Sequence, residues 1–368
     1  MDTHAFVARL AQDLVRIDSR SSVSNLPLAD RLYTELPDFE VERLEYKDPN
    51  GVNKSVLVAA RGSFGLAFSG HMDTVPETGW TTDPWSGRVE EDTLFGLGST
   101  DMKGPVASIV AAAIALPASV PVALLLTSDE ETTKQGARLI ARSSELARRF
   151  APKGIVIAEP TGMVPVRGDR SHIEFTAVAT GLQAHSSTGQ GRNANWALIP
   201  FMADMQRLFE RLRTDPALQD PAYDPPFSDF NPVIDNHGTA VNVTVPKASV
   251  RIKYRYSANV DPAPVIAAVH EAAAKHGLEV SETREGAPPE LPADHPLIAL
   301  ASSMVGGAAP RTAPFGTDAS ELQALAPCVI FGPGDVAEAH KPTEKVSLSE
   351  LAGAVPVFVR MATQVAGG

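Results

Sequence analysis

Short apolar runs that alternate with helical segments constrain the fold of this chain more than any other feature of its sequence. The runs that we expect to be buried strands span residues 55–60, 65–69, 120–126, 154–158 and 328–331. The segments with helical character span residues 104–116, 133–150 and 347–365. Strands that are apolar on both sides and separated by helices predict an α/β fold, with a mostly parallel sheet covered by helices on both faces.

A different pattern begins near residue 167. The strands expected there alternate polar and apolar residues, as strands with one exposed face do, and span residues 172–179, 241–245 and 249–256. The Pro- and Asp-rich residues 214–232 predict a loop or an edge segment, and helices are expected at 193–212 and 262–276. This order is typical of a small α+β domain. We therefore predict one domain of residues 1–166 plus 286–368, interrupted by a second domain of residues 167–285.

The charge and the apolar content exclude several classes of partner. The net charge of −12 makes nucleic acid a poor partner. The longest mainly apolar stretch, residues 106–116, is shorter than the roughly 20 residues that cross a bilayer, and residues 1–20 lack the pattern of a signal peptide. Cys328 is the single cysteine and belongs to an apolar run, so we expect a buried thiol and no intrachain disulfide. The sequence predicts a cytoplasmic protein with no membrane contact.

Histidine and acidic residues follow the apolar runs and form five separate motifs. These are His71-x-Asp73, the Gly-rich turn before Asp101, the acidic pair Glu130-Glu131, Glu159 before Pro160, and His340 in a Gly/Pro-rich loop. Each motif alone has an ordinary explanation as a surface hydrogen bond, a helix cap, an acidic first turn or a loop residue. Together they place nitrogen and oxygen ligands at the carboxyl ends of strands, where open α/β sheets place their sites. Such ligands without cysteine suit Zn²⁺, Co²⁺ or Mn²⁺.

The order of these five motifs resembles the M20 family of co-catalytic metallopeptidases and N-acyl-amino-acid deacylases, over nearly the whole chain. Within that family, the ending from Gly332 to Pro342 is similar to acetylornithine deacetylases and their relatives. The resemblance implies a metal-binding catalytic domain and an inserted lid and dimerisation domain. It also implies two divalent metal ions, zinc in preference to cobalt or manganese.

The family's roles carry over to these motifs residue by residue. His71 and Glu159 would bind one metal, and Glu131 and His340 the other. Asp101 would bridge the two ions.

Further roles implied by the resemblance concern residues that bind no metal. Asp73 would orient His71, and Glu130 would be the general base. In the inserted domain, His185 lies in a motif, Gly181 to Ser187, that in the family reaches a neighbouring subunit's active site and stabilises the oxyanion. Asn242 and Arg255 fall where the family often contacts substrate, although an exposed charge on a lid strand explains Arg255 equally well.

The function implied is removal of an acyl group, acetyl in the first instance, from a small N-acyl amino acid by a homodimeric enzyme. Glu159 favours a deacylase, because many peptidases of the family carry Asp there. His237, Leu97 and Lys253 depart from the family pattern, and the last two leave the substrate open. The alternatives are a di- or exopeptidase, a hydrolase of another C–N bond, or a relative that has lost catalysis; the intact Glu130 argues against the last.

Overall fold

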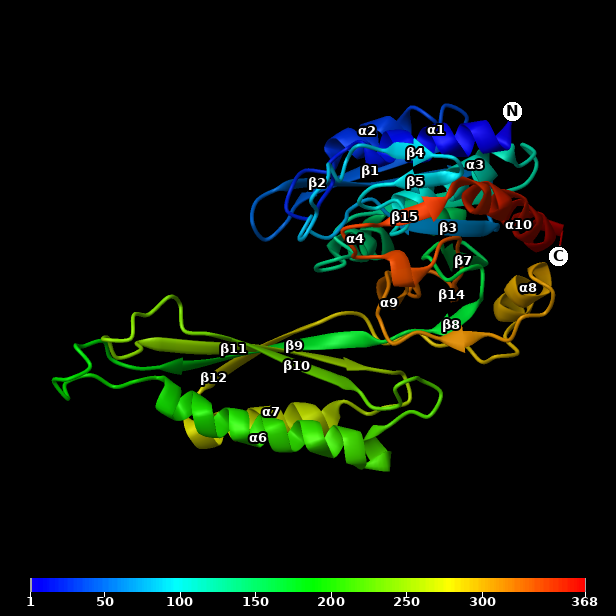
Figure 1. Ribbon diagram of the computed structural model, residues 1–368. Helices are drawn as coiled ribbons and strands as arrows, with labels where there is room; N and C mark the ends of the chain where they lie inside the picture. Colours follow the sequence, from blue (N-terminus) through cyan, green and yellow to red (C-terminus); the bar gives the residue numbers. More distant parts are fainter. Residues whose placement is uncertain (1, 368) are drawn as a thin grey trace. The chain divides into compact units, whose positions relative to one another are not determined.

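The computed structural model describes residues 2–367 (Figure 1). The chain divides into two compact units. Unit 1 comprises Met1–Gly168, Pro289–Arg311 and Thr317–Gly368, and unit 2 comprises Asp169–Pro288 and Thr312–Gly316. Within residues 2–367, no helix is long and apolar enough to cross a membrane.

Unit 1 is built around an eight-stranded sheet. The strands, in their order across the sheet, are β1 (Glu40–Lys47), β2 (Asn53–Arg61), β6 (Val122–Thr127), β3 (Leu66–His71), β7 (Gly154–Ile157), β14 (Cys328–Ile330), β8 (Val166–Gly168) and β13 (Arg311–Thr312). The central strands β6, β3, β7 and β14 run parallel, whereas β1, β2 and β8 pair antiparallel with their neighbours. The predicted α/β class with a parallel central sheet is confirmed.

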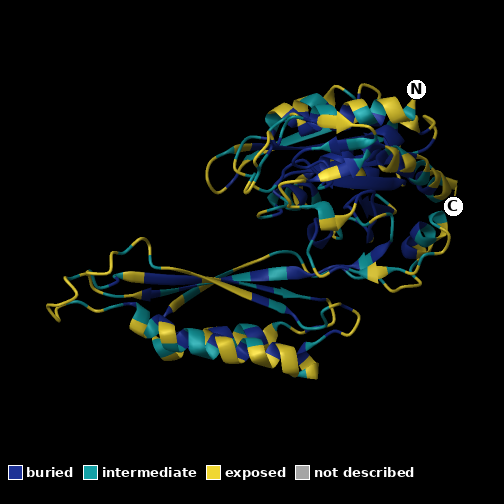
Figure 2. Cartoon of the chain, in the orientation of Figure 1, coloured by how far each residue is buried: buried dark blue, intermediate teal, exposed yellow. Residues whose placement is uncertain are grey.

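Helices cover the unit 1 sheet on both faces, as its apolar strands require. The helices are α1 (Thr3–Val15), α2 (Leu26–Tyr33), α3 (Lys103–Ala115), α4 (Gln135–Ser143), α5 (Glu145–Phe150), α8 (Pro296–Met304), α9 (Ala319–Leu322) and α10 (Leu348–Gly367). Alternate strand residues such as Leu57 and Ala59 belong to one core with α1, α3 and α10. Val56 faces the other way and lies against Gly136 of α4. All residues of β3, β6 and β7 are buried (Figure 2).

A second, three-stranded sheet in unit 1 joins two distant parts of the chain. Its order is β15 (Lys345–Ser347), β5 (Thr93–Phe95) and β4 (Arg88–Glu90), with antiparallel pairing throughout. Strand β15 begins five residues after His340, and β5 ends six residues before Asp101. This sheet therefore brings together the loops that carry these two residues.

Unit 2 is an antiparallel sheet with two helices against one face (Figure 1). The strand order is β10 (Asp229–Asp235), β11 (Lys247–Tyr256), β9 (Ser171–Thr180) and β12 (Glu279–Arg284). The helices are α6 (Asn195–Thr214) and α7 (Ala263–His276). Residues of β9 alternate between buried and partly exposed, because one face of the sheet packs on these helices. The predicted inserted α+β fold is confirmed.

The prediction of one strand in unit 2 is wrong. Residues 241–245 form no regular strand: Val243 makes a single bridge to His185, and Val241 is fully exposed. The place beside β11 is taken by β10, which contains Pro232. Proline lacks an amide hydrogen but is tolerated in an edge strand, where one side of the strand needs no ladder partner.

Candidate metal centre

Three of the five motifs meet because their strands β3, β6 and β7 are neighbours in one sheet, and the loops of Asp101 and His340 are joined by the three-stranded sheet. His71 is the last residue of β3, which pairs in parallel with β6 and β7. Glu130 and Glu131 follow β6, and Glu159 follows β7. The carboxyl ends of parallel strands lie at the same edge, so side chains just beyond them converge.

Asp101 lies between two histidine–carboxylate pairs. His71 Nε2 is 3.0 Å from Asp101 Oδ1 and 4.0 Å from Glu159 Oε1. His340 Nε2 is 3.3 Å from Asp101 Oδ2 and 3.1 Å from Glu131 Oε1. Each oxygen of Asp101 therefore faces a different histidine, as a carboxylate shared by two ions would.

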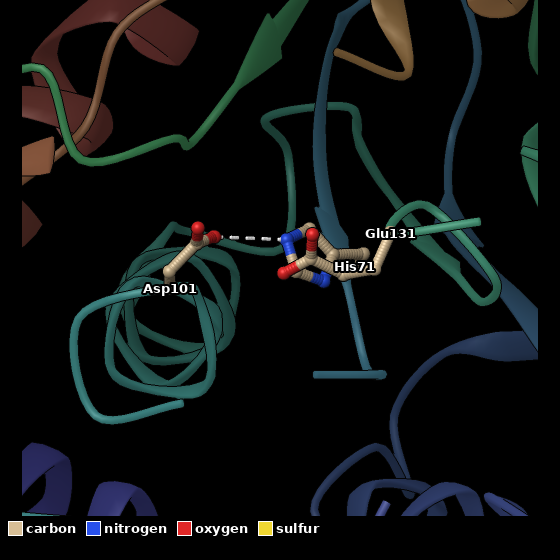
Figure 3. A group of neighbouring side chains, drawn as sticks. All are labelled: His71, Asp101 and Glu131. Carbon is tan, nitrogen blue, oxygen red and sulfur yellow. Dashed lines mark hydrogen bonds and ion pairs between the residues drawn. The ribbon is translucent and has the colours of Figure 1, made fainter. Parts of the chain in front are cut away.

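Three of these side chains already meet the geometry of a metal-binding group. One ligand atom from each of His71, Asp101 and Glu131 lies within 4.8 Å of the other two (Figure 3). Figure 3 shows the Asp101 carboxylate pointing from the start of α3 toward the ring of His71. Imidazole nitrogen and carboxylate oxygen are donors that zinc and related divalent ions accept, so the residues fit such ions.

The carboxylates of the cluster are buried close to one another, which disfavours their ionised forms. Burial raises the pKa of Glu159 well above its usual value, and the charge of Asp101 adds to the rise. Burial likewise raises the pKa of Glu130 and of Glu131. Acids packed this way stay ionised only if cations or protons offset their repulsion.

The carboxylates raise the pKa of both histidines, which favours protonated rings beside them. Hydrogen bonds to Asp101 and Glu131 raise the pKa of His340 to about 11. Burial opposes protonation of His71, but the hydrogen bond with Asp101 and the charge of Glu159 raise its pKa well above the usual value. The same contacts outweigh burial at Asp101 and hold its pKa below the usual value. A divalent cation can replace protons held in this way, since metal binding releases them.

Asp73 lies beneath the cluster and is fully buried. Its carboxylate accepts hydrogen bonds from Ser21 Oγ at 2.7 Å and from the amides of Glu130 and Glu131 at 3.1 and 3.3 Å. The nearest partner of His71 Nδ1 is the Asp73 carbonyl oxygen at 2.9 Å, and the carboxylate is farther away at 3.7 Å. A carbonyl accepts only from a protonated Nδ1, which leaves His71 Nε2 as the ligand atom.

Glu130 presents a buried carboxylate oxygen, Oε1, that accepts no hydrogen bond from the described residues. The ammonium of Lys134 lies 3.7 Å from this oxygen. The preceding Asp129 has a φ of 61°, and His340 has a φ of 59°. Both values lie in the left-handed region, which residues other than glycine rarely adopt. Such backbone conformations cluster at functional sites.

Two charged residues that support this region escaped sequence analysis. Lys54 is completely buried, and its ammonium lies 3.0 Å from Asp129 Oδ1. Glu344 is 1% exposed and accepts hydrogen bonds from backbone amides near Asp101. A lysine at the start of an otherwise apolar strand needs a buried partner, and this signal could have identified Lys54. Glu344 has no comparable signal, because its partners lie far away in the sequence.

The remaining predicted site residues belong to unit 2. The exposed His185 and Asn242 lie side by side, because Ser186 N donates to the Asn242 carbonyl at 3.0 Å. The Nδ1 of His185 lies 2.7 Å from Ser187 Oγ. Arg255 is on β11, where its guanidinium forms an ion pair at 2.6 Å with Asp229 of the neighbouring strand β10.

The chain is similar to known metal-dependent hydrolases over most of its length. Residues 67–364 match the model of peptidase family M20/M25/M40. The acetylornithine deacetylase of Proteus mirabilis (strain HI4320) is 30% identical over 347 residues, covering 90% of this chain and 88% of that protein.

Two solved structures share the fold. A di-peptidase from Saccharomyces cerevisiae has a TM-score of 0.76 at 15% identity, covering 100% of this chain and 98% of the other. A dinuclear metal-binding peptidase of the M20 family from Bacillus subtilis has a TM-score of 0.66 at 17% identity, covering 99% of both chains. At these identities, the likeness shows the fold alone.

Proposed function

The chain belongs to peptidase family M20/M25/M40 and is a metal-dependent amide hydrolase, and we propose that it removes the acyl group, acetyl in the first instance, from an N-acyl amino acid. The observation that carries the proposal is the Asp101 carboxylate, whose two oxygens face His71 and His340. The similarity to an acetylornithine deacetylase over most of the chain supports the substrate class.

The proposed ligand set follows from the contacts of Asp101. His71 and Glu159 would hold one ion, Glu131 and His340 would hold the other, and Asp101 would be shared. Zinc is the preferred ion for two histidines and three carboxylates, and cobalt or manganese are alternatives. Two divalent cations bound there supply Lewis-acid chemistry that lowers the pKa of water and polarises a carbonyl group.

Glu130 is the proposed general base. Its Oε1, which accepts no hydrogen bond from the described residues, takes a proton from the attacking water and then gives that proton to the departing amine nitrogen. Asp73 holds the amides of Glu130 and Glu131, so it fixes the turn from which the base projects.

Unit 2 supplies the proposed contacts to the substrate. His185 donates a hydrogen bond to the oxyanion, and Asn242 and Arg255 contact the substrate carboxylate. Arg255 can make this contact while it keeps Asp229, because a guanidinium has five N–H donors.

A homodimer is part of the proposal, since the family places the equivalent of His185 in a neighbour's site. Exposed apolar side chains support it: Trp196 and Ile199 on α6, and Val233 and Ile234 on the edge strand β10. Exposed apolar patches and unpaired edges favour association. Light scattering on the purified protein should give twice the chain mass.

The deciding experiment is a substrate panel on metal-reconstituted protein. N-acetyl-ornithine, N-acetyl-citrulline, N-succinyl amino acids and dipeptides are assayed side by side, with metal content measured in parallel. We expect the N-acetyl substrates to have the highest kcat/KM. Cleavage of dipeptides in their place would establish the alternative, a di- or exopeptidase, which the fold likeness to peptidases accommodates.

A further inference from the structure

Glu344 is a buried acidic residue that no proposed step of the reaction uses. It lies four residues after His340 and directly before β15, and its side chain is 1% exposed. A buried carboxylate is costly unless hydrogen bonds or positive charges offset the loss of water. Its partners therefore indicate what it does.

The partners of Glu344 are the backbone amides of the Gly-rich turn before α3. Thr100 N and Asp101 N both donate to Glu344 Oε1, at 2.9 and 3.0 Å, and Gly98 N donates to Oε2 at 3.1 Å. In addition, Gly96 N donates to the Glu344 carbonyl oxygen at 3.1 Å. One residue thus binds four amides of a turn that belongs to no helix or strand.

The same contacts join the turn to the loop that carries His340. Thr100 Oγ1 donates to the Lys345 carbonyl at 2.8 Å, next to Glu344. His340 Nε2 in turn lies 3.3 Å from Asp101 Oδ2. One short segment, residues 340–345, therefore contacts both the backbone of Asp101, through Glu344, and its carboxylate, through His340.

We infer that Glu344 is a positioning residue, which fixes the Asp101 backbone so that its two carboxylate oxygens face His71 and His340, and which thereby sets metal affinity at both proposed positions. The inference rests on the proposed metal site. Without the carboxylate, three backbone N–H groups lose their acceptor, and the turn can shift to find others. Asp101 is shared between the ions, so a shift of its backbone weakens both.

The test compares Glu344→Gln with wild type. Glutamine has nearly the same shape, but it is neutral and presents N–H donors in place of one oxygen, so at least one amide of the turn loses its acceptor. The matched control is Glu338→Gln, in the same loop, whose partly exposed carboxylate pairs with Lys341 at 3.5 Å. Zn²⁺ affinity of each metal-free protein is measured by competition with a chromophoric chelator, and the visible spectrum of the Co²⁺ form reports ligand geometry.

Loss of an outer partner of a metal ligand typically weakens binding by about 10–100-fold. We expect that loss for Glu344→Gln, with a changed Co²⁺ spectrum and faster hydrogen exchange at Gly98, Thr100 and Asp101. Glu338→Gln should match wild type in all three measurements. Equal affinity and an unchanged spectrum in a folded Glu344→Gln protein would overturn the inference while leaving the proposed site intact.

Two further results separate the inference from the proposed function. Wild-type protein that binds no metal would overturn the proposed site, and the inference with it. If Glu344→Gln does not fold, hydrogen exchange on metal-free wild type decides: protected amides at Gly98, Thr100 and Asp101 support the inference, and exchange as fast as in an open loop overturns it.

Discussion

Lys54 provides a strong test of the energetics of unit 1. It has no exposed surface, and its ammonium donates to the carbonyl oxygens of Ser21 and Val23 at 2.7 and 2.8 Å. The third partner is Asp129 Oδ1 at 3.0 Å, while Tyr46 donates to the other oxygen of Asp129 at 2.8 Å. Lys54→Met keeps the length and apolar character of the stem but removes the charge.

The expected cost follows from what the substitution leaves behind. Asp129 would remain as a nearly buried carboxylate with Tyr46 as its hydrogen-bond donor among the described residues, and two carbonyl groups would lose their donor. Removal of one partner from a buried ion pair costs about 3–5 kcal/mol. In a domain of about 150–250 residues, each kcal/mol lowers Tm by about 2–4 °C, so the fall should be roughly 6–20 °C.

The assay is thermal and urea unfolding of metal-free protein, so that metal binding does not mask the change. Lys47→Met, an exposed lysine on the neighbouring strand β1, is the control and should change stability by less than about 0.5 kcal/mol. Adding Asp129→Asn to Lys54→Met should recover part of the loss, because the uncompensated charge disappears. A Lys54→Met protein as stable as the Lys47→Met control would refute the reasoning.

Three further predictions concern the site and its support. Glu130→Gln should lower kcat by about 10²–10⁴-fold with metal content unchanged, measured by steady-state kinetics and metal analysis; undiminished turnover would remove Glu130 from the mechanism. Asp73→Asn puts N–H donors in place of one of the two oxygens to which the amides donate, and should weaken metal binding by about 10–100-fold in chelator competition; wild-type affinity would show that the carboxylate is dispensable. Gly332→Ala places a Cβ 2.3 Å from the Ala158 carbonyl oxygen and should lower the free energy of unfolding in urea by about 1–3 kcal/mol. Gly353→Ala, in helix α10 with nothing within 4 Å of the new Cβ, should raise it by about 0.5–1 kcal/mol. Equal effects of the two substitutions would contradict the packing argument.

The central strands of the unit 1 sheet could be predicted because they are apolar on both faces, whereas the polar edge strand β1 could not. The runs around Phe68, Leu124 and Val156 have no polar side to expose, and only a covered parallel sheet accommodates such strands. That topology also explains why His71 and Glu159 converge, since both stand at the carboxyl ends of adjacent parallel strands.

Other features depend on contacts that no local pattern records. Strand β10 begins inside a Pro- and Asp-rich stretch, and its strand character comes from pairing with β11. The amides bound by Glu344 lie more than 240 residues earlier in the chain. The sequence pattern at Asp73 suggests a partner for His71, but its carboxylate is engaged mainly by Ser21 and by the turn after β6.

The position of β14 between β7 and β8 has a consequence for biosynthesis. β7 ends at Ile157, but its parallel partner β14 begins only at Cys328, after all of Asp169–Pro288 has been made. At about 5–20 residues per second, one edge of β7 waits on the order of ten to thirty seconds for its partner. During that interval an apolar strand with unsatisfied backbone groups is open to other chains, which is the condition that favours aggregation and chaperone binding. Substitutions in β7 and β14 should therefore lower the yield of folded protein mainly by their effect on the nascent chain, and less by their effect on the finished enzyme.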